Sequence, residues 1–155
     1  MGVHISQLPQ SVKDKLGLKD TPYRQFWAIV GDKEPIYFRS EWEFFYSLFL
    51  EKLKQEKKIK DWFHEPRCFW FTDWIKRGHV SYLPDYLIIH LNSSEEWVEV
   101  KGFLSSGCRV KIQRFRKYYP DLTLRVVDAK WFKENIKACR ALEPQLAKRI
   151  QKPQP

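Results

Sequence analysis

Three ionisable residues stand out because two short runs of β-forming apolar residues carry them. Asp85 begins the first run, which continues to Leu91, while Glu99 and Lys101 lie two positions apart on the second. A polar stretch, 92–96, separates the runs, so the segment predicts a β-hairpin. Residues two apart leave the same face of a strand. The hairpin is therefore expected to bring together an aspartate, a glutamate and a lysine, which can hold a divalent metal ion against a phosphate.

Phosphodiester hydrolysis is the chemistry that this set of side chains favours. The reaction needs an activated water, an electrophilic pull on phosphorus and charge relief at the leaving oxygen, and divalent metal ions supply all three. Mg²⁺, for which Mn²⁺ substitutes, prefers carboxylate and carbonyl oxygens. We therefore expect Asp85, Glu99 and the main-chain carbonyl of Val100 to be metal ligands. Lys101 is expected to position or help deprotonate the attacking water and to stabilise the pentacoordinate charge.

Each of these residues also has an interpretation without chemistry. A Pro-Asp pair is common in turns, and a Glu-x-Lys sequence on an exposed strand is often only a solvated face. The neighbours favour a site here, because Leu87 and Ile89 share a strand face with Asp85 and place the acid on an otherwise apolar side. His90 falls on the opposite face, and we expect it to be structural or solvated.

The composition favours one globular domain with a polyanionic partner. The chain has 155 residues, 43% of them apolar, and a net charge of +9, which is typical of a domain that binds nucleic acid. A protein that is basic only for solubility is the alternative. The three cysteines fit neither a disulfide framework nor a zinc site. Because no signal pattern and no apolar run of about 20 residues occurs, we expect a cytoplasmic protein without a membrane segment.

Helical and alternating periodicities predict a mixed α/β domain around the hairpin. Ser40, with Glu43 three residues later, is a capping-box pattern that begins a helix reaching about residue 57. Glu51 is expected on the solvent-facing side of that helix. The further elements expected are a strand over 61–72 interrupted near Pro66, a helix from Ser105 or Ser106 to about Tyr119, a strand over 122–127, and a helix over 131–141 that Pro144 does not let continue.

These elements are expected to form a single domain over residues 1–155. The passage from strand 97–102 through a helix to strand 122–127 predicts a parallel pair. The expected organisation is an N-terminal extension over 1–36 with a short helix at 11–16 and candidate strands at 26–30 and 36–38, a catalytic core over 37–130, and a C-terminal helix with a basic, mobile tail over 131–155.

Basic residues on both sides of the hairpin are candidate DNA contacts. Such contacts to backbone phosphates give affinity and salt dependence rather than sequence choice. A solvated helix face is the alternative for each of them. The candidates are Lys76, Arg77 and His79 before the hairpin and Arg109, Lys111, Arg114 and Lys117 on the helix after it.

Five blocks of the sequence carry a resemblance to a known group of enzymes. Pro84-Asp85 followed by Glu99-Val100-Lys101 matches the signature of the PD-(D/E)xK nuclease superfamily. The order of blocks resembles the phage Holliday junction resolvases of the endonuclease I type, over about Ile36 to Asp128. The five blocks are 40–43, 64–66, 81–87, 99–102 and 118–122.

The resemblance implies a restriction-endonuclease-like core, with a mixed central β-sheet flanked by helices. It places Asp85, Glu99 and Lys101 at the metal-binding and catalytic positions and Glu43 at the first-helix glutamate that assists the metal site. Glu43 has the alternative role of closing the capping box, and Glu41 is the fallback carboxylate. The run from Leu104 to Cys108 departs from the family pattern, so the exact phosphate contacts do not carry over. The chain also lacks the long linking element that gives a swapped dimer in the enzyme it resembles, so the dimer geometry does not carry over.

The function expected from this resemblance is Mg²⁺-dependent endonuclease activity on four-way junctions or other branched DNA. Symmetric cutting of a junction needs two sites, so a homodimer is expected. Another nuclease of the same fold, such as a restriction, transposon-end or single-strand-cutting enzyme, is one alternative. A non-catalytic nucleic-acid-binding module is a second, and a basic interaction protein is a third.

Overall fold

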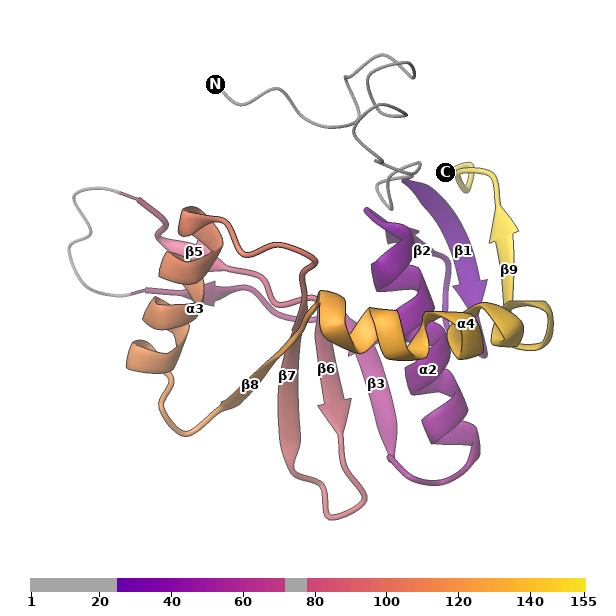
Figure 1. Cartoon of the computed structure of the whole chain (residues 1–155), viewed down its shortest axis with the longest axis horizontal. Coiled ribbons are helices and arrows are strands. Elements are labelled where there is room, and N and C mark those ends of the chain that lie inside the picture. The colour runs from indigo at the N-terminus through magenta and orange to yellow at the C-terminus, as the bar shows by residue number, and fades with distance from the viewer. Residues whose placement is uncertain (1–24, 72–77) are drawn as a thin grey trace.

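The computed structural model describes residues 25–71 and 78–155, and it confirms the mixed α/β class. Three helices and three small sheets are assigned within those residues (Figure 1). The central sheet has four strands in the order β3-β6-β7-β8. The bounds of these strands are β3 Asp61–His64, β6 Tyr86–Ile89, β7 Glu95–Val100 and β8 Thr123–Val127.

The predicted hairpin and the predicted parallel pair are both confirmed in the central sheet. Strands β6 and β7 pair antiparallel, and β7 pairs parallel with β8 through the crossover helix α3 (Ser106–Tyr118). The turn between β6 and β7 places Ser93 at a positive φ of 67°. Helix α3 begins at one of the two predicted start points. Ser105 is its N-cap, and the Ser105 side chain accepts a hydrogen bond from the Cys108 N–H.

The single strand expected over 61–72 is instead two strands in different sheets. Strand β3 ends at His64, and β4 (Phe69–Trp70) pairs with β5 (Ser81–Tyr82) in a separate two-stranded sheet. Glu65 adopts a positive φ of 45°, and the following Pro66 has no N–H to continue a ladder. The break turns the chain from the central sheet toward α3, which β5 contacts.

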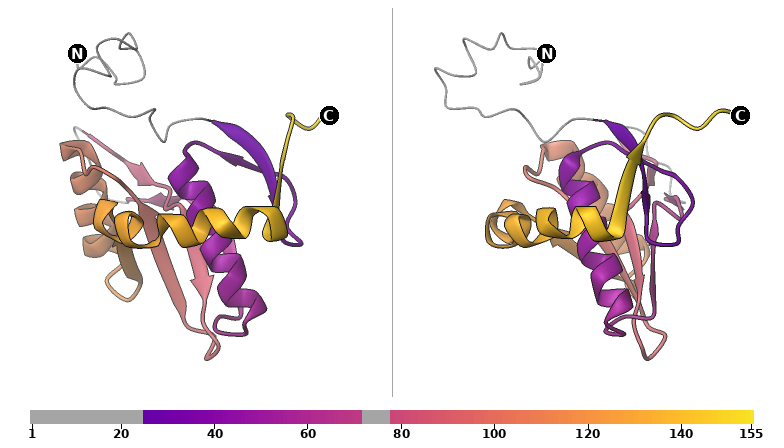
Figure 2. Two further views of the ribbon diagram at one scale, coloured as in Figure 1. Left: turned by 45° about the vertical axis from the view of Figure 1, so that its right-hand side comes forward. Right: turned by 90° about the vertical axis from the view of Figure 1, so that its right-hand side faces the viewer.

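Helix α2 (Glu41–Gln55) begins at the predicted cap, Ser40, and is covered on almost every side. The prediction that Glu51 faces solvent is wrong: its side chain is buried and accepts a hydrogen bond of 2.9 Å from Trp62 Nε1. Glu51 is covered because the turn after β1 and strand β3 pack on its side of the helix: a Cβ on Gly31 would collide with Glu51 Oε1, and Trp62 belongs to β3. Figure 2 shows α4 lying across α2.

The two ends of the described chain meet in a third sheet, with strand order β2-β1-β9. Strands β1 (Phe26–Val30) and β2 (Ile36–Phe38) match the candidate strands, whereas β9 (Ala147–Ile150) was not predicted. Helix α4 (Ala129–Leu146) continues through Pro144, so the expected interruption there is wrong. Pro144 lies so near the helix end that it removes only one late hydrogen bond. The candidate helix at 11–16 lies outside the described residues.

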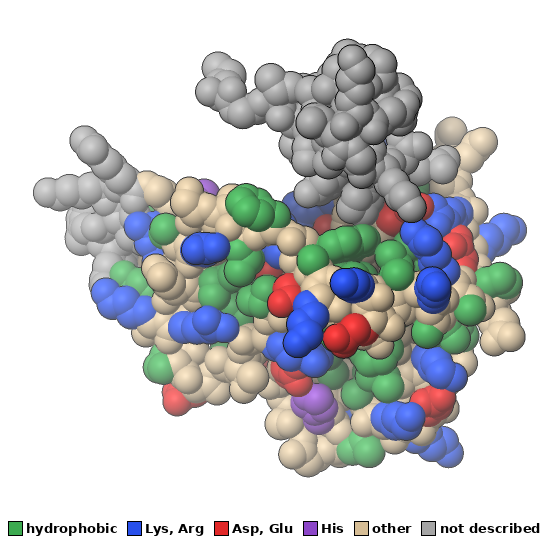
Figure 3. All heavy atoms as spheres, viewed as in Figure 1, with side chains coloured by type: hydrophobic (Ala, Val, Ile, Leu, Met, Phe, Trp, Pro, Cys, Tyr) green, Lys and Arg blue, Asp and Glu red, His purple; other side chains and the backbone are tan. Residues whose placement is uncertain are grey.

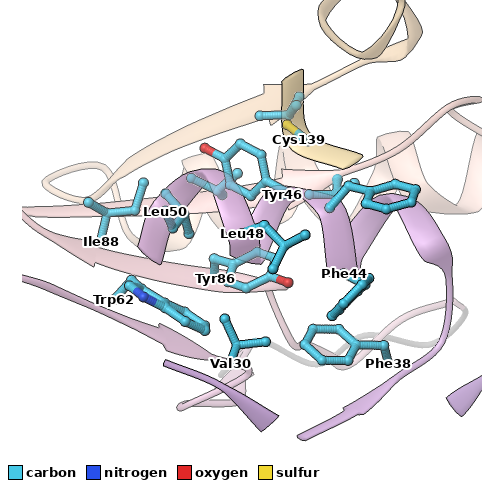
Figure 4. Close-up of a cluster of buried hydrophobic side chains, with 14 of the residues drawn as sticks. Val30, Phe38, Phe44, Tyr46, Leu48, Leu50, Trp62, Tyr86, Ile88 and Cys139 are labelled. Carbon is cyan, nitrogen blue, oxygen red and sulfur yellow. The ribbon is translucent and has the colours of Figure 1, made fainter. Parts of the chain in front are cut away.

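Side chains alternate across the central sheet and build a core on each face. Tyr86, Ile88 and Val98 face α2 and belong to the larger core, whose packing Figure 4 shows. Trp97 and Leu124 face α3 and belong to the second core. None of the helices in the described residues has the length and apolarity of a membrane span.

Candidate active site

The four predicted catalytic residues come together where three elements meet at one end of the central sheet. Strand β6 begins, β7 ends and α2 begins at this end (Figure 1). Asp85 immediately precedes β6, Glu99 is the penultimate residue of β7, and Glu43 lies in the first turn of α2. All three carboxylates are buried, at 3%, 4% and 6% exposure respectively. Burying three acids together is unfavourable unless cations or donors compensate them.

Asp85 is held by the backbone of both neighbouring strands. Its Oδ2 accepts a 2.7 Å hydrogen bond from the Val100 N–H, and its carbonyl accepts a 2.8 Å bond from the Glu65 N–H. Burial, followed by the negative charges of Glu99 and Glu43, raises the pKa of Asp85 well above its usual range. A carboxylate with this surplus of negative surroundings is a natural ligand for a divalent cation.

Glu99 is surrounded by three groups that all approach its carboxylate. The Tyr82 hydroxyl donates to Oε2 at 2.5 Å, Lys101 Nζ lies 3.5 Å from Oε1, and Cys108 Sγ lies 3.8 Å from Oε1. Burial and the Glu99 charge raise the pKa of Tyr82, so its hydroxyl stays protonated and donates. Sequence reasoning did not assign roles to Tyr82 or Cys108, although Tyr82 falls inside one of the five blocks.

Lys101 is partly exposed and stays charged in this environment. Burial alone lowers its pKa, but the charges of Glu99 and Asp85 outweigh burial and raise it. An ammonium group that holds its proton is poorly suited to remove a proton from water. The arrangement therefore favours the predicted charge-stabilising role of Lys101 over the predicted role in deprotonation.

Glu43 contacts the helix cap with its backbone and lies near His64 with its side chain, and its predicted part in a metal site stays a prediction. Its N–H donates to Ser40 Oγ at 3.1 Å, as in a capping box, while its Oε2 lies 3.7 Å from His64 Nε2. Burial raises the pKa of Glu43, but His64 and then Arg39 outweigh burial and lower it. The fallback acid, Glu41, forms an ion pair with Arg149 at 2.9 Å on the side of β9.

His64 is a member of the site that sequence reasoning set aside. Its ring lies between Phe38 and Tyr86, with both centroid distances 5.3 Å. Its Nε2 is buried, and the 3.7 Å to Glu43 is longer than a hydrogen bond. The block 64–66 was the available signal, but a single histidine in this block has no metal-ligand spacing to the other histidines.

The donor set suits a hard divalent cation that keeps part of its water shell. Mg²⁺ typically takes one or two carboxylates and several waters, and Asp85 with Glu99 meets that requirement. Within residues 25–71 and 78–155, no three His, Cys, Asp or Glu side chains stand close enough to enclose a metal ion by themselves. The charge of Glu43 acts on Asp85 less strongly than the charge of Glu99 does. The carbonyl of Val100 as a ligand stays a prediction.

The predicted DNA contacts within the described residues differ in exposure and in the contacts they make. Lys76 and Arg77 lie outside the described residues. Arg114 Nη1 donates to the His79 carbonyl at 2.5 Å, so this guanidinium holds the chain before β5 in place. Of the remaining candidates on α3, Arg109 and Lys117 are exposed and Lys111 is half-buried. Figure 3 shows lysine and arginine side chains on both the α3 side and the α2–α4 side of one face.

Comparison with known proteins identifies one family. A family model described as "Protein of unknown function (DUF1064)" matches residues 29–134. The match runs from within β1 to the beginning of α4 and contains Glu43, Asp85, Glu99 and Lys101. No curated protein and no solved structure matches the chain.

Proposed function

We propose that this chain, which belongs to the DUF1064 family of proteins of unknown function, is a metal-dependent endonuclease that cuts branched DNA. The observation that carries the proposal is the meeting of Asp85, Glu99 and Glu43, all buried, with the charged Lys101 at one end of the sheet. Three acids buried side by side are unfavourable in a purely structural core and are typical of a site that binds a cation.

The side chains divide the work in the proposed reaction. Mg²⁺ or Mn²⁺, held by Asp85 and Glu99, would supply Lewis acidity and an activated water. The Val100 N–H orients Asp85, and the Tyr82 hydroxyl orients Glu99. Lys101 stabilises the negative charge that develops on the phosphate oxygens. Glu43 adds negative charge near the Asp85 carboxylate and so strengthens cation binding.

The charge of the chain supports a DNA substrate. The net charge is +9, and exposed basic residues lie on α3, whose first turn brings Cys108 to the Glu99 carboxylate. Phosphate contacts of this type give salt-dependent affinity. Paired cuts across a four-way junction require two sites, so we propose a homodimer as the active form. The three cysteines are free, which fits the cytoplasm as the place of action.

One cleavage experiment tests the proposed function. The full-length protein is incubated with a four-way junction and with a linear duplex of the same arm sequence, in Mg²⁺ or in EDTA. We expect cleavage of the junction only in Mg²⁺, and a loss of about 10²-fold or more for Lys101→Ala. Lys137→Ala, on the exposed side of α4, is the charge-matched control and should cleave normally.

The possible results distinguish the proposed endonuclease from the alternative functions. Intact substrates in every metal condition would end the enzyme proposal and favour a binding module. Equal cleavage of duplex and junction would retain the nuclease and remove its preference for branched DNA. Equal loss in Lys101→Ala and Lys137→Ala would remove Lys101 from the reaction.

A further inference from the structure

A shallow groove lies between α3 and the edge strand β8, outside the catalytic residues described above. Its volume is about 220 Å³. Its lining combines apolar side chains with an amide and two guanidinium groups. The lining residues are Leu104, Arg109, Ile112, Gln113, Arg116 and Val126.

The register of the sheet places this groove directly beside the metal-binding residues. Val126 in β8 is the partner of Glu99 in the parallel β7–β8 ladder. Partners in a ladder share a sheet face, and neighbouring strands lie about 4.8 Å apart. Val126 therefore stands next to Glu99 on the face that α3 covers. The groove begins one strand away from the proposed reaction centre.

The positively charged wall of the groove is formed by one side of α3. Arg109 and Arg116 are seven residues apart, with Gln113 between them, so they follow the same side of the helix. Arg116 Nη2 donates to the Leu124 carbonyl at 3.3 Å, which holds its guanidinium at the β8 edge. Guanidinium groups bind phosphate oxygens with directed hydrogen bonds.

An exposed aromatic residue, Phe103, lies in the sequence between Lys101 and Leu104, the first residue that lines the groove. Phe103 is 77% exposed, the largest exposure among the large apolar side chains described. It follows Lys101-Gly102 and precedes Leu104, a lining residue of the groove. Leaving such a ring in water is unfavourable, and nucleobases stack on exposed aromatic rings in single-strand-binding proteins.

We propose that the groove holds one unpaired nucleotide of the DNA, next to the phosphodiester that is cut. The base lies on the apolar floor and against Phe103, and its phosphate lies against Arg109 and Arg116. A base inside a duplex is already stacked and paired and reaches such a groove only by leaving the helix. The groove therefore selects branch points, bulges and other places with an unpaired nucleotide. This inference rests on the proposed function for its link to cleavage.

Binding measurements test the groove without requiring activity. Full-length Asp85→Asn protein in EDTA is titrated with a duplex that contains a one-nucleotide bulge and with the same duplex without the bulge. We expect tighter binding of the bulged duplex and quenching of 2-aminopurine placed at the bulge. Phe103→Ala should reduce the preference for the bulge by roughly tenfold, the size of one lost stacking contact.

A matched pair of groove variants guards against effects on folding. Gln113 is exposed on α3, so Gln113→Trp fills the groove without entering the core, whereas Gln113→Ala leaves the groove open. We expect Gln113→Trp to lose the bulge preference and Gln113→Ala to keep it, with unchanged affinity for plain duplex in both. Lys137→Ala, on α4, controls for a change in surface composition.

The outcomes distinguish this inference from the proposed function. Equal binding of bulged and plain duplex would overturn the proposal that the groove holds an unpaired nucleotide. An unchanged preference for the bulge in Phe103→Ala and Gln113→Trp would overturn it as well. A groove-dependent preference in a protein whose wild type never cuts DNA would support the nucleotide site while the endonuclease fails. If the wild type cuts DNA but neither groove variant changes its choice of substrate, the endonuclease proposal is supported and the nucleotide site is refuted.

Discussion

The Val100 N–H donates a 2.7 Å hydrogen bond to Asp85 Oδ2 and so ties the residue before β6 to the end of β7, between Glu99 and Lys101. The contact orients one oxygen of the Asp85 carboxylate with a backbone group that cannot rotate away. Because Val100 stands between Glu99 and Lys101 in the chain, the same bond sets the position of Asp85 against both. This contact and three others near it, made by Tyr82, Glu43 and Gly102, each lead to a testable prediction.

Replacing Asp85 by asparagine should remove activity and increase the stability of the metal-free protein near pH 8. Burial and the Glu99 and Glu43 charges raise the folded-state pKa of Asp85, so the folded protein holds this proton more tightly than the unfolded chain. Its contribution to the free energy of unfolding therefore falls as pH rises from the unfolded pKa of about 3.9 through the raised folded value. Asparagine can still accept the Val100 hydrogen bond.

The measurement is thermal unfolding of wild type and Asp85→Asn in EDTA at pH 4 and pH 8. The variant should unfold at a higher temperature than wild type at pH 8 and at a similar temperature at pH 4, where the wild-type acid is largely protonated. Cleavage should fall by about 10²-fold or more. A variant that is less stable than wild type at pH 8 would show that the Asp85 charge is well compensated.

Tyr82→Phe should weaken metal binding while the fold is retained. The change removes only the hydroxyl that donates to Glu99 Oε2 at 2.5 Å. Loss of a hydrogen bond to a metal ligand typically weakens affinity about 10–100-fold. Isothermal titration with Mn²⁺ gives the affinity. Tyr37→Phe, which removes an exposed hydroxyl bonded to Gln25, is the control and should bind Mn²⁺ as wild type does; equal affinities in all three proteins would refute the role of Tyr82.

Glu43→Gln and Ser40→Ala should separate the two roles of the α2 N-terminus. Glutamine keeps the side-chain acceptor of a capping box but removes the charge, so activity should fall far more than stability. Ser40→Ala removes the cap that accepts from the Glu43 N–H and should cost about 1 kcal/mol of stability with most activity retained. Denaturant unfolding and cleavage rates are compared for both variants. Parallel losses in Glu43→Gln would assign Glu43 to the cap alone.

Gly102→Ala should disturb the contact between α2 and the end of β7. A Cβ at Gly102 would lie 2.6 Å from Cζ3 of Trp42, which is itself stacked on Phe132 with centroids 4.5 Å apart. Overpacking of this kind costs about 1–3 kcal/mol. The shift would also move Glu43, one residue from Trp42, relative to Lys101. Activity should therefore fall together with stability.

The stability test for Gly102 is a double-mutant cycle with Trp42→Leu. The double variant should be less destabilised than the sum of the single variants, because the smaller side chain admits the new methyl group. Gly107→Ala, in the first turn of α3, is the control; its Cβ would meet side chains away from Trp42, the His79 ring at 3.0 Å and Ser105 Oγ at 4.0 Å. Additive effects of Gly102→Ala and Trp42→Leu would exclude a direct clash.

Much of the fold was predictable from local signals, and the errors have physical causes. The Ser40 cap and the β6–β7 hairpin depend on residues within one turn of each other, so their patterns are visible in the chain. Glu51 was misplaced because its partner, Trp62 Nε1, belongs to another element, and a charged residue on a helix reads as solvent-facing. Strand β9 was missed because Ala147–Ile150 has no strand pattern of its own and forms by pairing with β1.

The candidate site likewise contains some residues that the sequence identified and others that only the structure identified. Asp85, Glu99 and Lys101 were recognisable because Glu99 and Lys101 lie two apart at the end of β7 and Asp85 directly precedes the strand paired with it. Tyr82, Cys108 and His64 were not assigned, because a tyrosine, a cysteine and a histidine each have many uses and only their neighbours in space define one.

Patterns within the chain were sufficient for the class of fold, the hairpin and the acid–lysine set, because each depends on side-chain alternation or on contacts between residues close in sequence. The tertiary structure decided the rest. Glu43 lies near enough to Asp85 for its charge to raise the pKa of Asp85, although 41 residues separate the two in the chain, and neither segment alone shows this. The tertiary structure also decided that Val126 stands beside Glu99, because the register of a parallel pair is set by the packing of the crossover helix between the two strands.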